Sequence, residues 1–288
     1  METPNEIKKV VREKYAKLAV KEQPKSCCGS PTGEYANFNE DYSNLEGYNA
    51  DADLGLGCGL PTEFAQIKEG DTVVDLGSGA GNDCFVARQV VGEKGKVIGV
   101  DMTPEMIDKA RINAAKLNFN NVEFRLGEIE NLPIAEGEAD VVVSNCVLNL
   151  VPDKVKAVAE TFRILKPGGH FSISDIVTKA ELPAGLRKEA SMYAGCVSGA
   201  LPIEEYMGII NSTGFEAVQI QKERKINLPK ETLEKYLSEK EVEEFMKEDA
   251  GIFSITVYAQ KPGGNTEQST EQKNESTEEA CCGPTCCS

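Results

Sequence analysis

Three cysteines in loop-like contexts are the residues of this sequence best suited to bind a soft ion. Cys58 lies in DLGLGCGLP, Cys146 in VVVSNCVLNLVP and Cys196 in MYAGCVSGALP. Thiolates select zinc, Cu(I) or heavier thiophilic elements. The chain has one histidine, so chemistry built on histidine pairs, including most catalytic zinc sites, is excluded. Each cysteine alone is typical of a small buried hydrophobic residue, but together they favour a thiophilic centre.

Two other residues of the same types receive structural interpretations. Cys84, followed by apolar residues in CFVA, is predicted to be a small buried hydrophobic residue. His170, in KPGGHFSIS, is predicted to be packed within a strand. The loop cysteines are widely spaced and the chain has no Cys-x2-Cys pair, so a structural zinc site is not expected.

A glycine-rich segment, VVDLGSGAGNDCF, joins a predicted strand to a predicted helix. Gly77, Gly79 and Gly81 allow a tight turn and a close approach of the backbone to a ligand at the helix N-terminus. Asp75 ends the strand just before them, where a carboxylate opposes a pyrophosphate but suits a cation. Glycine spacing alone is a weak indication, so the neighbouring acids decide the ligand.

A second acid points to the nature of that ligand. Asp101 closes the next strand in VIGVDMTPEM, and an acid at this position binds ribose hydroxyls. An adenosine ligand with positive charge and no phosphate satisfies both acids, which favours S-adenosylmethionine. The alternative is a tight turn in which Asp101 caps the helix that begins near Thr103.

These residues are carried by an alternation of short apolar runs and amphipathic segments. Strands are predicted at 72–76, 96–100, 122–126, 140–144, 170–176, 215–223 and 252–260. Helices are predicted at 4–20, 80–91, 103–117, 152–165, 202–213 and 230–248, the last as a charged, solvated face. Such alternation is typical of a parallel sheet covered on both faces. We therefore predict an α/β, Rossmann-like fold with a mostly parallel, seven-stranded sheet.

Composition narrows the class of partner. The 288 residues carry a net charge of -16, which argues against nucleic acid and anionic membranes. The N-terminus, METPNEIKKVVREKY, lacks the apolar core of a signal peptide, and no run reaches the roughly 20 apolar residues of a membrane span. We expect a cytoplasmic chain, in which ten cysteines indicate soft-ion binding or redox chemistry rather than structural disulfides.

Together these motifs resemble the arsenite S-adenosylmethionine methyltransferases of microbes and animals, a family with the class I methyltransferase fold. The resemblance runs from about residue 4 to residue 261. It is carried by VREKYAKLA…CCG, LGLGCGLPTEFA, DLGSGAGNDCF, GVDMTPEMI, GEIENLP, SNCVLNLVPDK, KPGGHFSISDI and GCVSGAL. The glycine loop is shared by many methyltransferases, whereas the cysteine contexts make the match specific.

The resemblance implies roles for individual residues. Cys58, Cys146 and Cys196 are expected to bind trivalent arsenic, and Cys27 or Cys28 is expected to be the redox partner of Cys58. Thioredoxin or glutathione is the implied reductant, with arsenite and methylated arsenicals as substrates. The residues expected to bind S-adenosylmethionine are Asp75, Gly77, Ser78, Gly79, Gly81, Asp101, Met102, Gly127, Glu128, Ile129 and Asn145. Further arsenic ligands are suggested in the C-terminal CCGPTCCS at Cys281, Cys282, Cys286 and Cys287.

Four segments are expected along the chain. They are an N-terminal helix with a cysteine-containing arm (1–59), a cofactor-binding Rossmann-like domain (60–180), the rest of the fold with an arsenic-site loop (181–261), and a disordered acidic linker with the cysteine-rich tail (262–288). We expect a monomer that binds neither nucleic acid nor membrane.

Two functions from other classes stay open on the sequence. One is a small-molecule, quinone-type C-methyltransferase with incidental cysteines, which would retain activity after Cys146→Ser. The other is a thiol protein that sequesters metalloids without turnover, which would bind arsenic without consuming S-adenosylmethionine.

Overall fold

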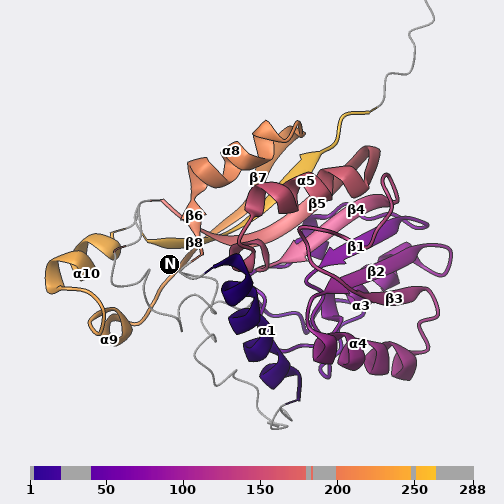
Figure 1. Cartoon of the computed structure of the whole chain (residues 1–288), viewed down its shortest axis with the longest axis horizontal. Coiled ribbons are helices and arrows are strands. Elements are labelled where there is room, and N and C mark those ends of the chain that lie inside the picture. The colour runs from indigo at the N-terminus through magenta and orange to yellow at the C-terminus, as the bar shows by residue number, and fades with distance from the viewer. Residues whose placement is uncertain (1–2, 21–39, 180–182, 184–198, 248–250, 264–288) are drawn as a thin grey trace, which may run out of the picture.

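A computed structural model of the chain describes residues 3–20, 40–179, 183, 199–247 and 251–263 (Figure 1). Its strands are β1 Thr72–Leu76, β2 Lys96–Asp101, β3 Val122–Leu126, β4 Ala139–Asn145, β5 Leu165–Thr178, β6 Leu201–Pro202, β7 Glu216–Ile226 and β8 Ile252–Gln260. Its helices are α1 Pro4–Val20, α2 Pro61–Phe64, α3 Asn82–Val91, α4 Pro104–Leu117, the 3-10 helix η1 Leu148–Leu150, α5 Lys154–Ile164, α8 Ile203–Ser212, α9 Lys230–Leu233 and α10 Glu239–Phe245. The cysteines with predicted roles that lie outside the described residues are Cys27, Cys28, Cys196, Cys281, Cys282, Cys286 and Cys287.

The strands form one mixed sheet in the order β3-β2-β1-β4-β5-β8-β7. The first five are parallel, whereas β8 runs antiparallel to both β5 and β7. The prediction of a mostly parallel sheet with seven principal strands is confirmed. The two-residue β6, which pairs with the end of β5, is an eighth strand that is too short to leave a periodic signal in the sequence.

Parallel pairing brings the ends of three strands to one edge of the sheet. Leu76, the last residue of β1, pairs with Val100 of β2 and with Ser144 of β4. The glycine loop, Asp101 and the residues after β4 therefore emerge side by side, although about 70 residues of sequence separate the first from the last. In a doubly wound sheet this edge is where ligands bind.

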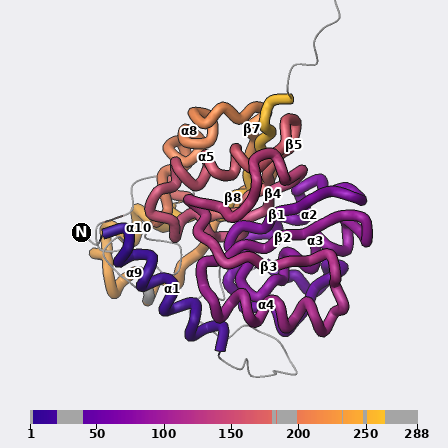
Figure 2. The backbone as a smooth tube through the Cα atoms, turned by 45° about the vertical axis from the view of Figure 1, so that its right-hand side comes forward, coloured from indigo at the N-terminus to yellow at the C-terminus, as the bar shows by residue number. Residues whose placement is uncertain are grey.

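Alternating side chains of the sheet pack into two separate cores, one on each face. Val73 and Val97 point toward a core with Phe85 of α3 and Ile107 of α4. Their neighbours Val74 and Ile98 point to the opposite core, together with residues of α5 and α8. Figures 1 and 2 show α5 and α8 on the side of the sheet opposite to α4, with α1 lying beside α4.

A third apolar cluster lies at the ligand edge and corrects one expectation. The charged stretch 230–248 is not a single solvated helix: it forms α9 and α10, joined through a turn. Its charged residues are exposed, but Leu233 and Phe245 are buried in a cluster that also contains Cys58 and Cys146. Burial of these apolar side chains stabilises the segment against the site.

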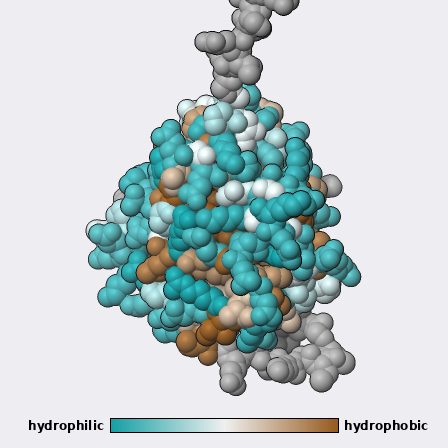
Figure 3. All heavy atoms as spheres, turned by 90° about the vertical axis from the view of Figure 1, so that its right-hand side faces the viewer, coloured by the Kyte–Doolittle hydropathy of each residue, from teal (hydrophilic) through white to brown (hydrophobic). Residues whose placement is uncertain are grey.

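The surface agrees with the acidic composition. The face shown in Figure 3 is mostly hydrophilic, with hydrophobic atoms in smaller areas. Within the described part of the chain, no helix is both long and apolar enough to cross a membrane.

Candidate active site

The glycine loop after β1 folds tightly against the neighbouring strands. The backbone N–H of Gly77 donates to the carbonyl of Val100 at 2.7 Å, and a Cβ at Gly77 would lie 2.5 Å from Val147. Gly79 has φ +51°, and a Cβ there would meet no atom within 4 Å. The backbone at Gly77 thus needs glycine for packing, while at Gly79 it faces open space suited to a ligand.

Asp101 orders this loop from the end of β2. One carboxylate oxygen accepts the N–H of Gly79 at 3.0 Å, and the other accepts the N–H of Thr103 at 2.8 Å. The alternative prediction of a local turn therefore holds in part, since Asp101 supports the chain just before α4. Burial raises the pKa of Asp101, opposed by the hydrogen bonds from Thr103 and Gly79. Carboxylate oxygens only accept hydrogen bonds, so Asp101 is suited to hydroxyl donors as well as to these backbone groups.

A pocket opens at this edge and gathers most of the predicted cofactor residues. Of the predicted set, those in its wall are Asp75, Gly77, Ser78, Gly79, Asp101, Met102, Gly127, Glu128, Ile129 and Asn145. Gly81 is not in the wall: it has φ +99° before α3, where a Cβ would lie 2.8 Å from Phe85 and 2.9 Å from Phe124. Its role in the fold is close packing of the helix on the strands.

The pocket is strongly acidic. Its lining carboxylates are Asp53, Asp75, Asp83, Asp101, Glu128 and Glu130, against a single lining lysine, Lys8. Such a field favours a cationic ligand and opposes a phosphate. Ser78 adds a hydroxyl that is buried and has no hydrogen-bond partner among the described residues.

Tyr42 and Asp83 are among the wall residues that the sequence did not predict. The hydroxyl of Tyr42 donates to Asp83 at 2.9 Å and lies 3.1 Å from the carbonyl of Gly59. Burial raises the pKa of Asp83 to about 6, with hydrogen bonds from Tyr42 and Asn145 opposing the shift. The only sequence signal for Asp83 was its place two residues after Gly81, in the first turn of a helix.

Asp75 lies next to Asp83 and accepts a hydrogen bond from Cys84. Burial, and then the charge of Asp83, raise the pKa of Asp75 well above its usual value. The thiol of Cys84 donates to Asp75 at 3.3 Å. Cys84 is buried as predicted, and it is also a polar partner of the pocket's innermost carboxylate.

The N-terminal helix α1 covers the other end of the pocket. Lys8, Val11 and Tyr15 of α1 lie in its wall. The ammonium of Lys8 is 2.7 Å from the carboxylate of Glu128 and 3.0 Å from that of Glu130. These ion pairs are mostly shielded, because the Lys8 side chain is 16% exposed. The loop that contains Glu128, which is expected to bind the cofactor, is therefore joined by ion pairs to a helix about 120 residues earlier in the sequence.

Two of the three predicted arsenic ligands come together at this edge. Cys58 and Cys146 are buried, with 0% and 6% exposure, in the same apolar cluster, and Cys146 also lines the pocket. Cys146 has φ +61°, a left-handed conformation that is uncommon for residues other than glycine. Cys196 is not among the described residues, and within those residues no group of three histidine, cysteine or acidic side chains is arranged to hold a metal ion.

The single histidine has a structural partner. Nε2 of His170 lies 2.6 Å from the carbonyl oxygen of Ala65, and its ring packs near that of Tyr258. The interpretation of His170 as a packed residue fits these contacts.

The fold and this pocket define a class I S-adenosylmethionine-dependent methyltransferase, and comparison with known proteins agrees. A family model described as a methyltransferase domain matches residues 67–248. An arsenite methyltransferase of Halobacterium salinarum is 44% identical over 275 residues, which cover 90% of this chain and 68% of that protein. The human arsenite methyltransferase is 38% identical over 192 residues, 64% of this chain and 51% of that protein.

A solved structure extends the likeness to three dimensions. The crystal structure of an arsenic(III) S-adenosylmethionine methyltransferase from Chlamydomonas reinhardtii matches with a TM-score of 0.62 and 35% identity, covering 72% of this chain and 68% of that one. The chain belongs to the arsenite methyltransferase family. It spans about two thirds of its archaeal relative and about half of the human one.

Proposed function

We propose that this chain transfers methyl groups from S-adenosylmethionine to trivalent arsenic held by its own thiols, giving methylated arsenicals and so detoxifying arsenic. One observation carries the proposal: Cys146 lines the same pocket as the glycine loop and Asp101. A soft ligand for arsenic thus shares a cavity with groups suited to a cationic adenosine. The membership of the family supports the same reaction.

The residues of the pocket fit S-adenosylmethionine by charge and by space. The open backbone at Gly79 and the partnerless hydroxyl of Ser78 offer hydrogen-bonding groups to a ligand. Asp101 is proposed to bind the ribose hydroxyls, and the loop Gly127–Ile129 the adenine. When bound there, S-adenosylmethionine supplies an electrophilic methyl group on a sulfonium.

Cys58, Cys146 and Cys196 are proposed to hold As(III) as three thiolates in a pyramid. Binding of arsenous acid by three thiols releases three water molecules, so no net proton is transferred. The arsenic lone pair forms the new As–C bond and carries no proton, so the chain needs no general base, in keeping with its single histidine. The thiols contribute positioning, which requires the reacting atoms to approach within about 3–3.5 Å.

Each methyl transfer leaves arsenic formally pentavalent, and two electrons must return it to the trivalent state. Two thiols supply them by closing to a disulfide with loss of two protons. Cys58 with Cys27 or Cys28 is the proposed pair, and thioredoxin or glutathione then reduces the disulfide.

Replacing Cys27 and Cys28 together should impair the first methylation more than methylation of monomethylated arsenic. Peptide mapping of oxidised protein should find the doublet joined to Cys58, and a Cys58 that always stays reduced would contradict the relay.

The decisive test combines arsenite, a thiol reductant and S-adenosylmethionine with the full chain and analyses the products for methylated arsenic. Cys146→Ser and Cys196→Ser should each abolish every methylation step, while their affinity for S-adenosylmethionine stays that of the wild type. Cys58→Ser should lose arsenite methylation but can still methylate monomethylated arsenic, which needs two thiols.

Wild-type arsenite turnover by Cys196→Ser would refute the three-thiol site. Methylation of a quinone carbon that survives Cys146→Ser would favour the alternative enzyme, and arsenic binding without cofactor consumption would favour sequestration.

The C-terminal thiol pairs are proposed to capture arsenic and deliver it to this site by thiol exchange. Vicinal thiols on a polar linker raise the local thiol concentration to the order of mM. Deleting Cys281 to Ser288 should leave the maximal rate nearly unchanged, lower the rate when arsenite is scarce, and reduce the number of arsenic atoms bound. Loss of activity at saturating arsenite with excess reductant would instead make the tail part of the active site.

A further inference from the structure

We propose that Asn145 is a positioning residue that fixes Cys58 against Cys146, so that both thiols meet arsenic in a constant geometry. The inference rests on the proposed role of these cysteines as arsenic ligands. It assigns the side chain of Asn145 to the substrate site rather than to the cofactor. The contacts around the side chain carry the argument.

The amide oxygen of Asn145 holds the backbone of the Cys58 loop. Oδ1 accepts the N–H of Cys58 at 3.0 Å and the N–H of Gly59 at 3.3 Å. Backbone N–H groups are always donors, so these contacts fix which end of the amide faces the loop. Both acceptor positions of Oδ1 are therefore occupied by backbone N–H groups, one of the predicted arsenic ligand Cys58 and one of the next residue, Gly59.

The amide nitrogen is equally occupied. Nδ2 donates to the carbonyl of Gly59 at 2.8 Å and to the hydroxyl of Tyr42, and lies 3.4 Å from Asp83. Two hydrogens thus face three acceptors of the protein itself. The amide has no hydrogen-bonding capacity to spare for the cofactor, although Asn145 is one of the residues that line the pocket.

The loop is shaped to receive this amide. A Cβ at Gly57 would lie 2.6 Å from Nδ2 of Asn145, and a Cβ at Gly59 would lie 2.5 Å from the hydroxyl of Ser174. Real Cβ atoms do not approach other atoms so closely, so Gly57 lets the loop pack on the end of β4 and Gly59 lets it pack on the neighbouring β5. The GCG sequence is explained by this contact.

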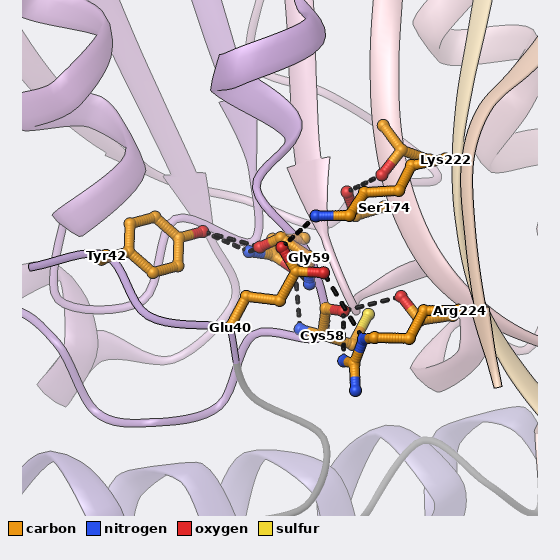
Figure 4. Close-up of polar contacts among 10 residues, drawn as sticks. Glu40, Tyr42, Cys58, Gly59, Ser174, Lys222 and Arg224 are labelled. Atoms are coloured by element: carbon orange, nitrogen blue, oxygen red, sulfur yellow. Dashed lines mark hydrogen bonds and ion pairs between the residues drawn. The ribbon is translucent and has the colours of Figure 1, made fainter. Parts of the chain in front are cut away.

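The opposite side of Cys58 is held as well. Its carbonyl oxygen accepts the hydroxyl of Ser254 at 2.6 Å and lies 3.4 Å from the guanidinium of Arg224. Arg224 is in turn 3.5 Å from the carboxylate of Glu40, and Figure 4 shows this arginine and Glu40 converging beside Cys58. With its N–H on Asn145 and its C=O on Ser254, Cys58 has a backbone constrained from both ends.

Cys146 is tied to the same side chain through the peptide bond that follows Asn145. Its N–H donates to the carbonyl of Ser174 at 2.8 Å, which continues the β4–β5 pairing by one residue. Its positive φ then turns the chain away from the strand. The backbones of two cysteines that are 88 residues apart in sequence are thus linked through the side-chain amide of Asn145.

The test measures steady-state kinetics of the full chain with arsenite, excess reductant and S-adenosylmethionine. Asn145→Ala removes the amide, so the KM for arsenite should rise about ten- to a hundredfold because Cys58 is no longer preorganised. The KM for S-adenosylmethionine, and its affinity by calorimetry, should change less than about threefold. Asn145→Ser is a second variant in case the alanine variant does not fold, and it should show the same split.

The matched control is Asn121→Ala. The Asn121 amide also bonds backbone, donating to the carbonyls of Gly92 at 2.8 Å and Gly95 at 2.9 Å, but at the opposite edge of the sheet. Its loss should lower stability and leave both KM values unchanged.

The outcomes separate this inference from the proposed function. If Asn145→Ala weakens S-adenosylmethionine with an unchanged KM for arsenite, the side chain serves the cofactor and the inference is wrong. If both KM values stay at wild-type levels while Cys58→Ser is inactive on arsenite, the arsenic site stands and the positioning role falls. If Cys58→Ser methylates arsenite like the wild type, the proposed ligand set itself fails.

Discussion

Asp83→Asn tests whether the ionised Asp83 carboxylate is unfavourable in the empty cofactor pocket and favourable once the cationic cofactor is bound. The Asp83 carboxylate lies in the pocket wall, accepts the hydroxyl of Tyr42 and neighbours Asp75. Burial raises its pKa from 3.8 to about 6, and the hydrogen bonds from Tyr42 and Asn145 keep the shift from being larger. The ionised form is therefore costly in the free protein and favourable beside a bound cation.

The magnitude follows from that shift. A rise from 3.8 to about 6 is about 2 pKa units, and each unit corresponds to about 1.36 kcal/mol, so ionised Asp83 costs about 3 kcal/mol of unfolding free energy at pH 8. The folded pKa is above the unfolded one, so the folded state binds more protons between pH 4 and 6. Stability from this group therefore rises as the pH falls, and about 1 kcal/mol of the cost is removed by pH 5.

The assay is urea unfolding of wild type and Asp83→Asn at pH 8 and pH 5. The variant has no titrating group at this position, so its stability relative to wild type should be higher at pH 8 than at pH 5 by about 1 kcal/mol or more. Costs of the substitution that do not depend on pH cancel in this difference. The figure is a lower bound, because removing the charge of Asp83 also lowers the pKa of Asp75, so the variant gains less stability than wild type from Asp75 as the pH falls. Equal differences at the two pH values would refute the reasoning.

The pH dependence of S-adenosylmethionine binding is an independent test of the ionisation of Asp83. Wild-type affinity for S-adenosylmethionine should weaken as the pH falls through about 6, because protonation removes one carboxylate that faces the cation. Asp83→Asn should bind more weakly at pH 8 and lose part of this pH dependence. Calorimetry at both pH values measures it, and parallel wild-type and variant curves would show that Asp83 does not face the cofactor.

Three further predictions concern the pocket and the loop beside it. Lys8→Met should raise the dissociation constant of S-adenosylmethionine about three- to tenfold by releasing α1 from two glutamates, as calorimetry would show; an unchanged constant would mean that α1 does not cover the bound cofactor. Asp101→Ala should weaken cofactor binding by about tenfold or more, since it removes ribose contacts and a bond that orders the glycine loop, while arsenite binding survives; unaltered cofactor affinity would defeat the ribose assignment. Gly59→Ala should destabilise the fold by about 1–3 kcal/mol in thermal unfolding, because the added Cβ clashes with Ser174. The matched control Gly208→Ala lies in α8, where a Cβ meets no other atom, and should stabilise the fold by about 0.5–1 kcal/mol. Equal effects of the two substitutions would contradict the close approach of Gly59 to Ser174.

The local parts of this protein were readable from the sequence. Short apolar runs and amphipathic segments predicted the principal strands and the helices of the sheet domain, because such patterns depend on neighbouring residues. The turn at Gly77 and Gly79 was equally local, as was the acid that closes β2. Ten of the eleven residues that the family resemblance marked as cofactor-binding lie in the pocket wall, whereas Gly81, which belongs to the glycine motif, is needed for packing.

The site itself was decided by contacts between distant segments. Tyr42 meets Asn145 across 103 positions, and Lys8 meets Glu128 across 120, so no local pattern announces either contact. The burial of Leu233 and Phe245 beside the cysteines was hidden by the charges around them. Residue types and motifs determined what chemistry the chain carries. Only the packing of strands and loops, which brings carboxylates, thiols and one amide to a single edge, decided which groups touch and how their charges shift.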